Sequence, residues 1–489
     1  MSRFTKAWPV WGGFLLVLAW MARLWVHMGP YPPGLDGGNW LLMGRRLFGI
    51  GAEAIGYPPH VYPPLIPVIM FGLSLVAGVP AAAKLLAVGS VAAVMAAVLW
   101  IARKALSPAV ALGIAFLTGA SFAIVEPAAF GGYPQNFAFA AGLVALEALA
   151  TYLQTGGTRS LVTATFFLFI TGLAHHAYFI LVSAASLTLI VLALALVRDM
   201  EDRLARTVRG LLAHLPGAVP FAFTARAMIE AGYTPPVNAP QFTHGNAFFH
   251  VFREPHIFWY AVLGLGFLRL LAISADQRRA LDLAALALGI TGGAAFIYAA
   301  EARLLPPVMV AAALGFGFLL DDSKDRPRAR LAATAIGACL LLWIAPSLDT
   351  QAKGVIAWFQ YMDEDYVEAA TWIHGHSPRG LVAVAADDRG YPLGWWLAGM
   401  ADARVIAGSD PRWLAFPKQR DLSDSISRVF DDRLLWFEAS KVARIEGIDF
   451  VVAPKRFWAH WQAWAFEEGV NVAFENGSWV VFDARLQKP

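Results

Sequence analysis

The stretch from Trp8 to Met28, WPVWGGFLLVLAWMARLWVHM, decides the class of this protein. A helix of about 20 mostly apolar residues crosses the hydrocarbon core of a bilayer, and this stretch is that long. It lacks the small-residue cleavage site that closes a secretory signal peptide. We therefore interpret it as a signal-anchor helix that stays in the membrane.

The composition of the whole chain agrees with this interpretation. Hydrophobic residues make up 58% of the 489 residues and charged residues only 15%, against about 25% charged residues in soluble domains. A formal charge of +3 is too small to indicate a nucleic-acid partner. The single cysteine, Cys339, lies in an apolar run, which excludes a disulfide framework and a cysteine-based metal site. The sequence therefore predicts a polytopic α-helical membrane protein in contact with the lipid bilayer.

Eleven apolar stretches are long enough to predict spanning helices. They cover residues 8–27, 81–102, 108–126, 135–154, 160–174, 177–197, 210–228, 256–273, 281–299, 304–320 and 330–347. A further stretch, 62–79, begins among the prolines Pro63, Pro64 and Pro67. Prolines at its head favour an interfacial or re-entrant helix over a full span, although a crossing stays possible.

Lysine and arginine in short loops predict the orientation. The basic groups are Arg3 and Lys6; Arg103 and Lys104; Arg198, Arg203, Arg206 and Arg209; Arg278 and Arg279; and Lys324, Arg326, Arg328 and Arg330. They fall on one side of the membrane only if 62–79 does not cross. We therefore expect a multi-pass protein of the cell (inner or plasma) membrane, with a cytoplasmic N-terminus and an extracytoplasmic C-terminal domain.

The composition changes near Leu348, after which charged residues and tryptophan become frequent. This change predicts a transmembrane domain over residues 1–348 and a soluble domain over 349–489. Short apolar runs at Leu381–Ala385, Arg404–Ala407 and Phe450–Ala453 alternate with helical patterns, and a hairpin closes the chain through Val470–Asp483. Alternating elements of this kind are typical of a small α/β domain.

The first outer loop carries the first candidate for chemistry. It reads Gly34-Leu35-Asp36-Gly37-Gly38-Asn39-Trp40. Glycines allow the backbone to crowd a ligand, and a carboxylate between them can act as a general base or bind a hard divalent cation such as Mg²⁺ or Mn²⁺. A solvated turn is the alternative, because Asp-Gly pairs favour turns.

The second outer loop carries another carboxylate, Glu126, followed by a Gly-Gly-Tyr-Pro turn. Glu126 is either a second acidic site, also able to bind a cation, or an interfacial helix end beside an aromatic anchor. Tyr133 and Gln135 in this loop, and His60 in the proline-rich run of the first loop, are candidate substrate-binding residues.

Cationic candidates occur in two further loops. His175 and His176 form a very short outer loop and either bind a phosphate or a metal, or are interfacial histidines. Neighbouring helical residues point about 100° apart, so we do not expect them to chelate together. Arg303 either pairs with Glu301, binds an anion such as a lipid phosphate, or extends to the interface. The loop 229–255, with His244, His250, Arg253 and Glu254, is long enough to act as a lid.

Together these features resemble the GT-C superfamily of membrane glycosyltransferases, which includes oligosaccharyltransferases, protein mannosyltransferases and lipid A aminoarabinose transferases. The resemblance rests on Asp36 after the first span, Pro63-Pro64-Leu65, Glu126, the run Arg303-Leu304-Leu305-Pro306 and an outer C-terminal domain. It implies a polyprenyl-phosphate-linked sugar donor, an extracytoplasmic acceptor and inverting attack with Asp36 as the base. It also implies a second acidic site at Glu126, where some members bind a divalent metal, and contacts from Arg303 and the histidine pair to the lipid phosphate.

A second resemblance lies in the C-terminal segment. Gly390-Tyr391-Pro392-Leu393-Gly394-Trp395-Trp396-Leu397, followed by Arg404 and Asp410, is similar to the oligosaccharyltransferase segment that begins WWDYG. Asp388-Arg389-Gly390-Tyr391-Pro392 replaces the Trp-Trp-Asp of that family, so asparagine-linked glycosylation is not expected. Two other classes stay open: a transporter, although the sequence shows neither repeats nor midplane polar residues, and a non-catalytic scaffold or assembly subunit.

Overall fold

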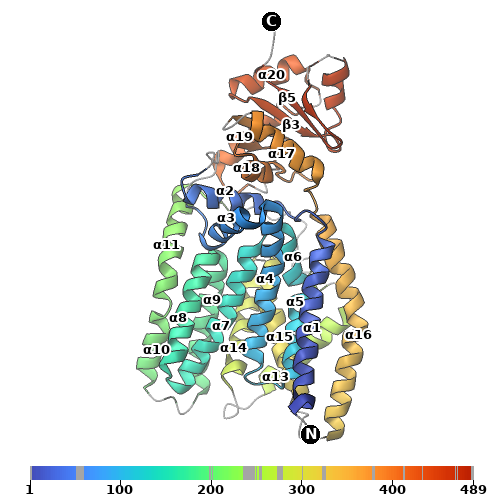
Figure 1. The fold of residues 1–489 in the computed structure, drawn as a ribbon. Helices are drawn as coiled ribbons and strands as arrows, with labels where there is room; N and C mark the ends of the chain where they lie inside the picture. The colour runs from blue at the N-terminus through green and yellow to red at the C-terminus, as the bar shows by residue number, and fades with distance from the viewer. Residues whose placement is uncertain are drawn as a thin grey trace. The chain divides into compact units, whose positions relative to one another are not determined.

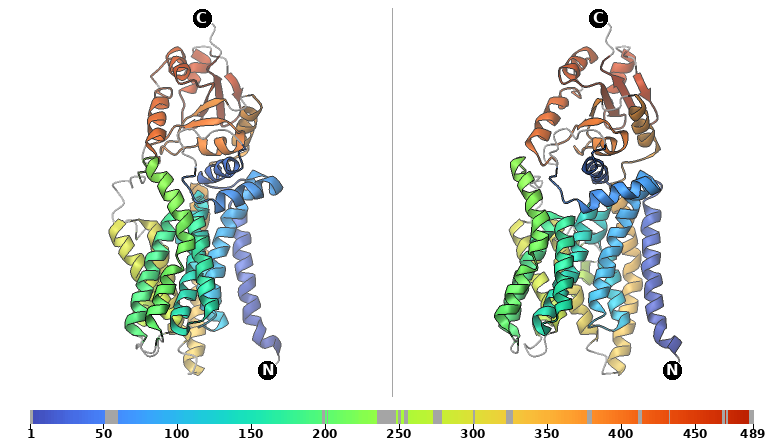
Figure 2. Two further views of the ribbon diagram at one scale, coloured as in Figure 1. Left: turned by 90° about the vertical axis from the view of Figure 1, so that its left-hand side faces the viewer. Right: turned by 60° about the vertical axis from the view of Figure 1, so that its left-hand side comes forward.

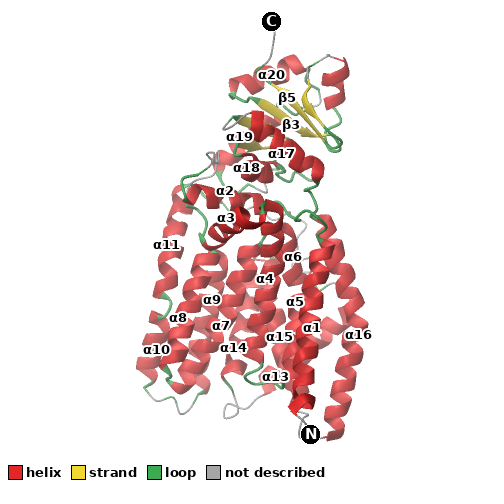
Figure 3. Cartoon of the chain, in the orientation of Figure 1, coloured by secondary structure: helices red, strands yellow, loops and turns green. Residues whose placement is uncertain are grey.

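The computed structural model describes residues 3–50, 60–197, 200, 202–234, 248, 251–252, 256–272, 279–299, 301–321, 327–376, 380–410, 414–431, 433–467, 470 and 472–485. The described chain is mostly helical, and its strands occur in the C-terminal part (Figure 3). The chain forms two compact units. The helical unit comprises Met1–His27, Leu86–Ala222 and Pro240–Trp358, and the mixed unit comprises Met28–Leu85, Phe223–Ala239 and Phe359–Pro489.

The helical unit is built from the apolar runs of the sequence, whose helices run side by side (Figures 1 and 2). Within it, α7 packs on α8 and α9, and α15 packs on α13 and α14. Its helices are α1 (Arg3–His27), α5 (Pro108–Ala120), α6 (Phe122–Phe130), α7 (Tyr133–Thr155), α8 (Thr158–Ala174), α9 (His176–Leu196), α10 (Arg203–Leu212), α13 (His256–Ala272), α14 (Ala280–Ala299), the short η2 (Ala302–Leu304), α15 (Leu305–Asp321) and α16 (Pro327–Trp358). Two more, α4 (Val79–Ala102) and α11 (Leu215–Glu230), each have residues in both units.

Five described helices are long and apolar enough to cross a membrane: α4, α7, α9, α14, and the helix Ala302–Asp321 formed by η2 and α15. A sixth is possible if α5 and α6 form one span, bent by 44° where Ser121 adopts an extended conformation. Shorter apolar helices occur at Phe14–His27, Leu65–Ala77, Thr158–Ala174 and Phe258–Ala272. The structure thus agrees with a polytopic helical membrane fold, while eleven spans stay a prediction.

The ambiguous stretch 62–79 forms α3 (Leu65–Ala77), which has 13 residues. At about 1.5 Å per residue it is roughly 20 Å long, shorter than the hydrocarbon core of about 30 Å. Its length is therefore consistent with the interfacial helix that the prolines predict.

A polar clamp joins the first and last helices of the helical unit. Arg23 in α1 donates from Nε and Nη2 to the two carboxylate oxygens of Asp349 in α16, at 2.8 and 2.9 Å. Nε2 of His27 lies 2.7 Å from Oδ1 of the same carboxylate. Asp349 lies two residues beyond the predicted span 330–347, and the adjacent arginine holds the pKa of its carboxyl down at about 2.

The mixed unit contains a five-stranded sheet in the order β2-β1-β3-β5-β4. Its strands are β1 (Leu381–Val384), β2 (Arg404–Ala407), β3 (Phe450–Pro454), β4 (Val472–Glu475) and β5 (Trp479–Asp483). β1 pairs in parallel with β2 and β3, whereas β5 pairs antiparallel with β3 and β4. Every residue of β1, β3 and β5 is buried, which explains why these strands read as continuous apolar runs.

Helices cover this sheet and supply an aromatic core. They are α17 (Glu364–His376), α18 (Gly394–Ala401), α19 (Pro417–Ser427), α20 (Trp436–Ile445) and the short η5 (Ala463–Glu467). Trp436 and Trp458 both pack edge-on against Trp464, with ring centroids 4.8 and 4.5 Å apart. The predicted alternation of helices and strands is thus present, and the strand Arg404–Ala407 has the predicted bounds.

Candidate functional site

Asp36 is the first residue of α2 (Asp36–Leu47), a helix of the mixed unit. The alternative of a solvated turn is therefore wrong, since the residue is helical and its flanking glycines are buried. The Asp36 side chain is half-buried and has no hydrogen bond or ion pair within the part of the chain that the structure describes. Burial raises the pKa of its carboxyl to about 7.

The two glycines after Asp36 bring α2 against α18. A Cβ atom on Gly37 would lie 2.4 Å from the ring of Trp396, and one on Gly38 would lie 2.4 Å from the carbonyl oxygen of Trp395. The sequence suggested that these glycines approach a substrate. In the structure, their close approach is to the two tryptophans of α18.

Two hydrogen bonds hold the chain just before Asp36. The indole N–H of Trp396 donates to the carbonyl oxygen of Gly34 at 2.6 Å. The N–H of Gly34 donates to the carbonyl oxygen of Phe359 at 2.8 Å. Both polar groups of Gly34 are therefore bonded to the C-terminal part of the mixed unit. The sequence analysis named Trp396 only as part of the oligosaccharyltransferase-like segment and missed its contact with Gly34. Phe359 was missed altogether, and no sequence pattern pointed to it.

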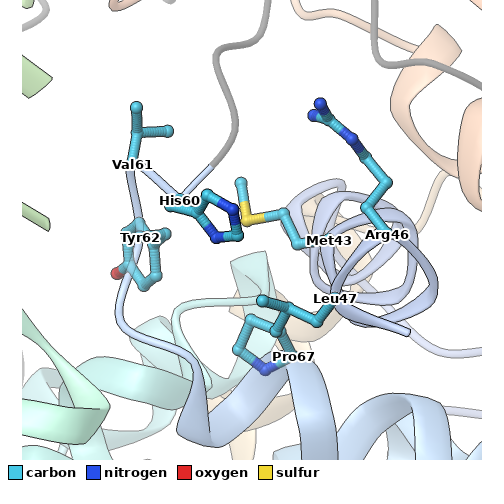
Figure 4. Close-up of a pocket in the computed structure, with 7 residues that line it drawn as sticks. All are labelled: Met43, Arg46, Leu47, His60, Val61, Tyr62 and Pro67. Carbon is cyan, nitrogen blue, oxygen red and sulfur yellow. The ribbon is translucent and has the colours of Figure 1, made fainter. Parts of the chain in front are cut away.

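A small pocket lies in the mixed unit, between α2 and the start of α3 (Figure 4). Its cavity volume is about 100 Å³, and its lining consists of Met43, Arg46, Leu47, His60, Val61, Tyr62 and Pro67. His60, a predicted substrate-binding residue, adopts a left-handed backbone conformation with φ of +61°. Ligand pockets usually enclose about 300–1,000 Å³, so this pocket could hold one small group but not a whole sugar donor.

Within the helical unit, the predicted cationic residues form one cluster. The rings of His175 and His176 stack with centroids 5.1 Å apart, and the Tyr178 hydroxyl donates to the carbonyl oxygen of Arg303 at 2.8 Å. His175 caps α9 by accepting from the Tyr178 N–H. The guanidinium of Arg303 pairs with Glu301, as one of the alternatives for Arg303 proposed.

The expected divergence of the two histidines is wrong. His175 is extended, with φ of −159° and ψ of 120°, and only His176 is helical, so the 100° rule for helical neighbours does not apply. That the two histidines do not chelate one ion together stays a prediction. Tyr178, which joins the histidines to Arg303, was missed; its position two residues after the pair was the only signal.

The segment predicted as the second outer loop lies mostly within α6 and the start of α7 and is largely buried. Tyr133 and Gln135 lie in the first turn of α7 and are 0% and 4% exposed, and Gln135 interacts with the Tyr178 hydroxyl. Gln135 thus joins the cluster around Arg303. Glu126 is half-buried within α6, which packs against α7 and α15. Asp36 belongs to the mixed unit and Glu126 to the helical unit. The second acidic site at Glu126, which the GT-C resemblance implies, stays a prediction.

A metal ligand set is not evident in the described ranges. No group of three or more histidine, cysteine, aspartate or glutamate side chains that could hold a metal ion occurs among the residues that the structure describes. The described residues therefore add no further ligand to Asp36 or Glu126, and the divalent cation at either residue stays a prediction. The lid residues His244, His250, Arg253 and Glu254 lie outside the described residues.

Solved membrane enzymes share this arrangement of elements. ArnT from Cupriavidus metallidurans bound to undecaprenyl phosphate matches with a TM-score of 0.57 at 13% identity, over 97% of this chain and 98% of that one. This chain has a fold similar to that of the GT-C glycosyltransferases. The Archaeoglobus fulgidus oligosaccharyltransferase, in complex with Zn and sulfate, matches with a TM-score of 0.55 at 13% identity, over 92% of this chain and 70% of that one.

A third GT-C structure is much longer. The arabinofuranosyltransferase AftD from Mycobacteria matches with a TM-score of 0.56 at 14% identity, over 94% of this chain but only 35% of its own. No protein-family model and no curated protein matches the sequence. The GT-C fold extends over nearly all of this chain, including both compact units, while the identities of 13–14% establish the fold alone.

Proposed function

We propose that this protein is a membrane glycosyltransferase that moves a sugar from a polyprenyl-phosphate-linked donor to an extracytoplasmic acceptor. The observation that carries the proposal is Asp36, a half-buried carboxylate with no hydrogen bond or ion pair in the described chain, at the start of α2 in a protein of GT-C fold. The matched ArnT structure, which holds undecaprenyl phosphate, supports a polyprenyl donor.

The proposed chemistry assigns the proton to Asp36. A pKa of about 7 leaves a large fraction of the carboxyl ionised near neutral pH and keeps it basic enough to accept a proton. The acceptor hydroxyl transfers its proton to Asp36 while its oxygen attacks the anomeric carbon. The bond from that carbon to the phosphate breaks, the configuration inverts, and polyprenyl phosphate leaves.

The departing phosphate gains negative charge, so cations beside it would lower the barrier. In this proposal Arg303 contacts that phosphate, and the half-buried His175 with the buried Tyr178 and Gln135 positions the segment that carries it. Arg303 is 47% exposed at its side chain, so its guanidinium is accessible despite the ion pair with Glu301.

The decisive experiment uses the full chain in lipid nanodiscs with a panel of polyprenyl-phosphate sugars labelled in the sugar, plus saccharide acceptors. We expect transfer with at least one donor. Asp36→Asn preserves size but cannot accept the proton, and it should slow transfer by a factor of about 10² to 10⁴. Absence of transfer with every donor would favour a transporter or a scaffold instead.

Asp363→Asn is the matched control. Asp363 is another carboxylate next to the start of a helix, burial also raises its pKa, and it accepts the N–H of Tyr366. Asparagine can make the same hydrogen bond, so this variant should keep parental transfer. Equal losses in both variants would remove Asp36 from the mechanism.

A further inference from the structure

The parallel strands of the mixed unit bring three loops to one edge of the sheet. Val384 pairs with Val452 of β3 and with Ala407 of β2, so the residues that follow these three strands leave the sheet side by side. Loops at the carboxyl ends of parallel strands are the usual place for ligand sites in α/β sheets. Here these loops carry Arg389 after β1, Ser409 after β2 and Arg456 after β3.

Arg389 is held in a fixed position by its own loop. The buried carboxylate of Asp387 accepts from the backbone N–H of Arg389 at 2.9 Å, from that of Tyr391 at 2.7 Å and from Nε of Arg389 at 3.0 Å. The guanidinium carbon lies 5.1 Å from the ring centroid of Tyr361 and 5.0 Å from that of Tyr391. Stacking between two aromatic rings and a buried ion pair order this arginine before any ligand arrives.

The neighbouring loops are joined to this arrangement. Ser409 Oγ and the N–H of Asp410 both donate to the carbonyl oxygen of Gly390, at 3.0 and 2.9 Å. Gly390 has φ of +76°, and a Cβ atom there would lie 2.6 Å from Cβ of Asp410, so the close approach of the two loops requires glycine. Arg456 is exposed in the third loop, two residues after β3, and its guanidinium carbon lies 5.2 Å from the ring centroid of Phe457. Its positive charge acts against that of Arg389.

We propose that this edge, formed by Arg389, Tyr361, Tyr391 and Arg456, binds the acceptor, and that the acceptor is a saccharide bearing an anionic group, a carboxylate or a phosphate. Two guanidiniums from different loops match an oxyanion, which each can bind through two parallel N–H bonds. The tyrosines add apolar ring area beside it, as sugar rings require. The acceptor role rests on the proposed function; the binding itself does not.

The edge is connected to Asp36 through the mixed unit. Phe359, two residues before Tyr361, accepts the N–H of Gly34, two residues before Asp36. On the other side, α18 follows the Arg389 loop directly and packs against the glycines that follow Asp36. The same contacts within the mixed unit therefore position both the proposed acceptor site and the proposed base.

Asp388 provides a sharp test of ligand charge. Its carboxylate is 68% exposed and lies 3.8 Å from Nε of Arg389, so it competes with an anion for that guanidinium. Asp388→Asn should therefore increase the affinity of the protein for an anionic saccharide. A site that recognises neutral sugar hydroxyls would instead use Asp388 as an acceptor, and the same substitution would weaken binding.

The experiment measures binding by calorimetry to the full chain in phosphatidylcholine nanodiscs, without donor, so that turnover plays no part. The probes are trigalacturonate, glucose 6-phosphate, neutral maltotriose and an acidic hexapeptide. We expect at least one of the two anionic saccharides to bind about tenfold or more tightly than maltotriose and the peptide. Arg389→Gln and Arg456→Gln should each weaken that binding about tenfold to a hundredfold, and salt should weaken it further.

Arg433→Gln is the matched control, because Arg433 pairs with Asp431 at the same spacing as Arg389 with Asp387 but is 84% exposed at its side chain. It should bind the probes as the parent does. Equal binding of neutral and anionic saccharides, preferential binding of the peptide, or equal loss in Arg433→Gln would overturn the proposal. Anionic binding that persists when no donor supports transfer would leave the site standing and remove the proposed function.

Discussion

The indole N–H of Trp396 donates a 2.6 Å hydrogen bond to the carbonyl oxygen of Gly34, across 362 positions of the sequence. Trp396 is fully buried, and its ring also lies where a side chain on Gly37 would be. One residue of α18 thus determines both where the backbone turns into α2 and how closely α2 can pack. The position of Asp36, between Gly34 and Gly37, depends on this contact.

Trp396→Phe should therefore impair transfer more than folding. The substitution keeps an aromatic ring but removes the N–H, which leaves the Gly34 carbonyl without this donor and costs about 1–3 kcal/mol. We expect a fall in kcat with little change in KM for the donor, because only the base is displaced. Trp396→Tyr, which also lacks the indole N–H, should behave alike.

Trp458→Phe is the control for lost stability alone. Trp458 is also buried, and its Nε1 donates to the carbonyl oxygen of Phe430 at 3.2 Å inside the aromatic core. It should lower the thermal midpoint by a similar amount and leave kcat unchanged. If both variants lose kcat in proportion to their loss of stability, Trp396 has no positioning role.

Gly38→Ala should separate α2 from α18. The new Cβ would lie 2.4 Å from the carbonyl oxygen of Trp395, a backbone atom that cannot move aside without shifting the helix. We expect loss of transfer and a lower thermal midpoint. Gly72→Ala in α3 meets nothing within 4 Å and should raise stability slightly through helix propensity. If Gly38→Ala kept the parental rate of transfer, the close packing of α2 on α18 would be contradicted.

The pH dependence of transfer should report the ionisation of Asp36. Because the base works only when deprotonated, log kcat/KM should rise with unit slope at low pH and level off above about pH 7. Asp36→Asn should lose this acid limb. A parental limb centred near 4, the ordinary range of an aspartate, would show that burial does not tune this carboxyl.

The same pKa predicts a stability effect of opposite sign to that of a salt-bridged aspartate. The folded-state pKa of Asp36, about 7, lies above the ordinary aspartate value of 3.8, so between these pH values the folded protein retains a proton that the unfolded chain has lost. The free energy of unfolding should therefore fall as pH rises from about 4 to 7. Asp36→Asn should melt higher than the parent at pH 8 and close to it at pH 4; no difference at pH 8 would argue against this burial.

Asp349 illustrates the usual sign. Its folded-state pKa of about 2 lies below 3.8, so its ion pair with Arg23 stabilises the fold above about pH 4, and this contribution is lost as pH falls towards 2. Asp349→Asn should lower the thermal midpoint at pH 7, and the difference from the parent should shrink near pH 2.5. Glu230→Gln, which breaks the exposed pair with Arg226, should change little at either pH.

Local pattern was sufficient for much of this fold. Apolar runs at the positions of α4, α7, α9, α14 and α15 identify helices that could cross a bilayer, since the bilayer imposes length and composition on each helix separately. The strands β1 and β3 were also found, because burial on both faces makes each a short apolar run. The strand β2 is only partly buried and was found from its apolar residues between two helical patterns. The break at Ser121 was not predicted, as the residues on both sides are equally apolar.

Asp36 was found as the candidate base because one carboxylate beside two glycines at the end of a span is visible in the sequence alone. Its half-burial and raised pKa depend on tertiary structure, because the packing of α2 on α18, through Trp395 and Trp396, joins residues about 360 positions apart. The link from the histidine pair to Arg303 through Tyr178 and the position of Arg389 between two tyrosine rings also depend on tertiary structure. Sequence periodicity reports which face of an element is apolar, whereas the partner of that face is chosen only when distant elements compete to bury it.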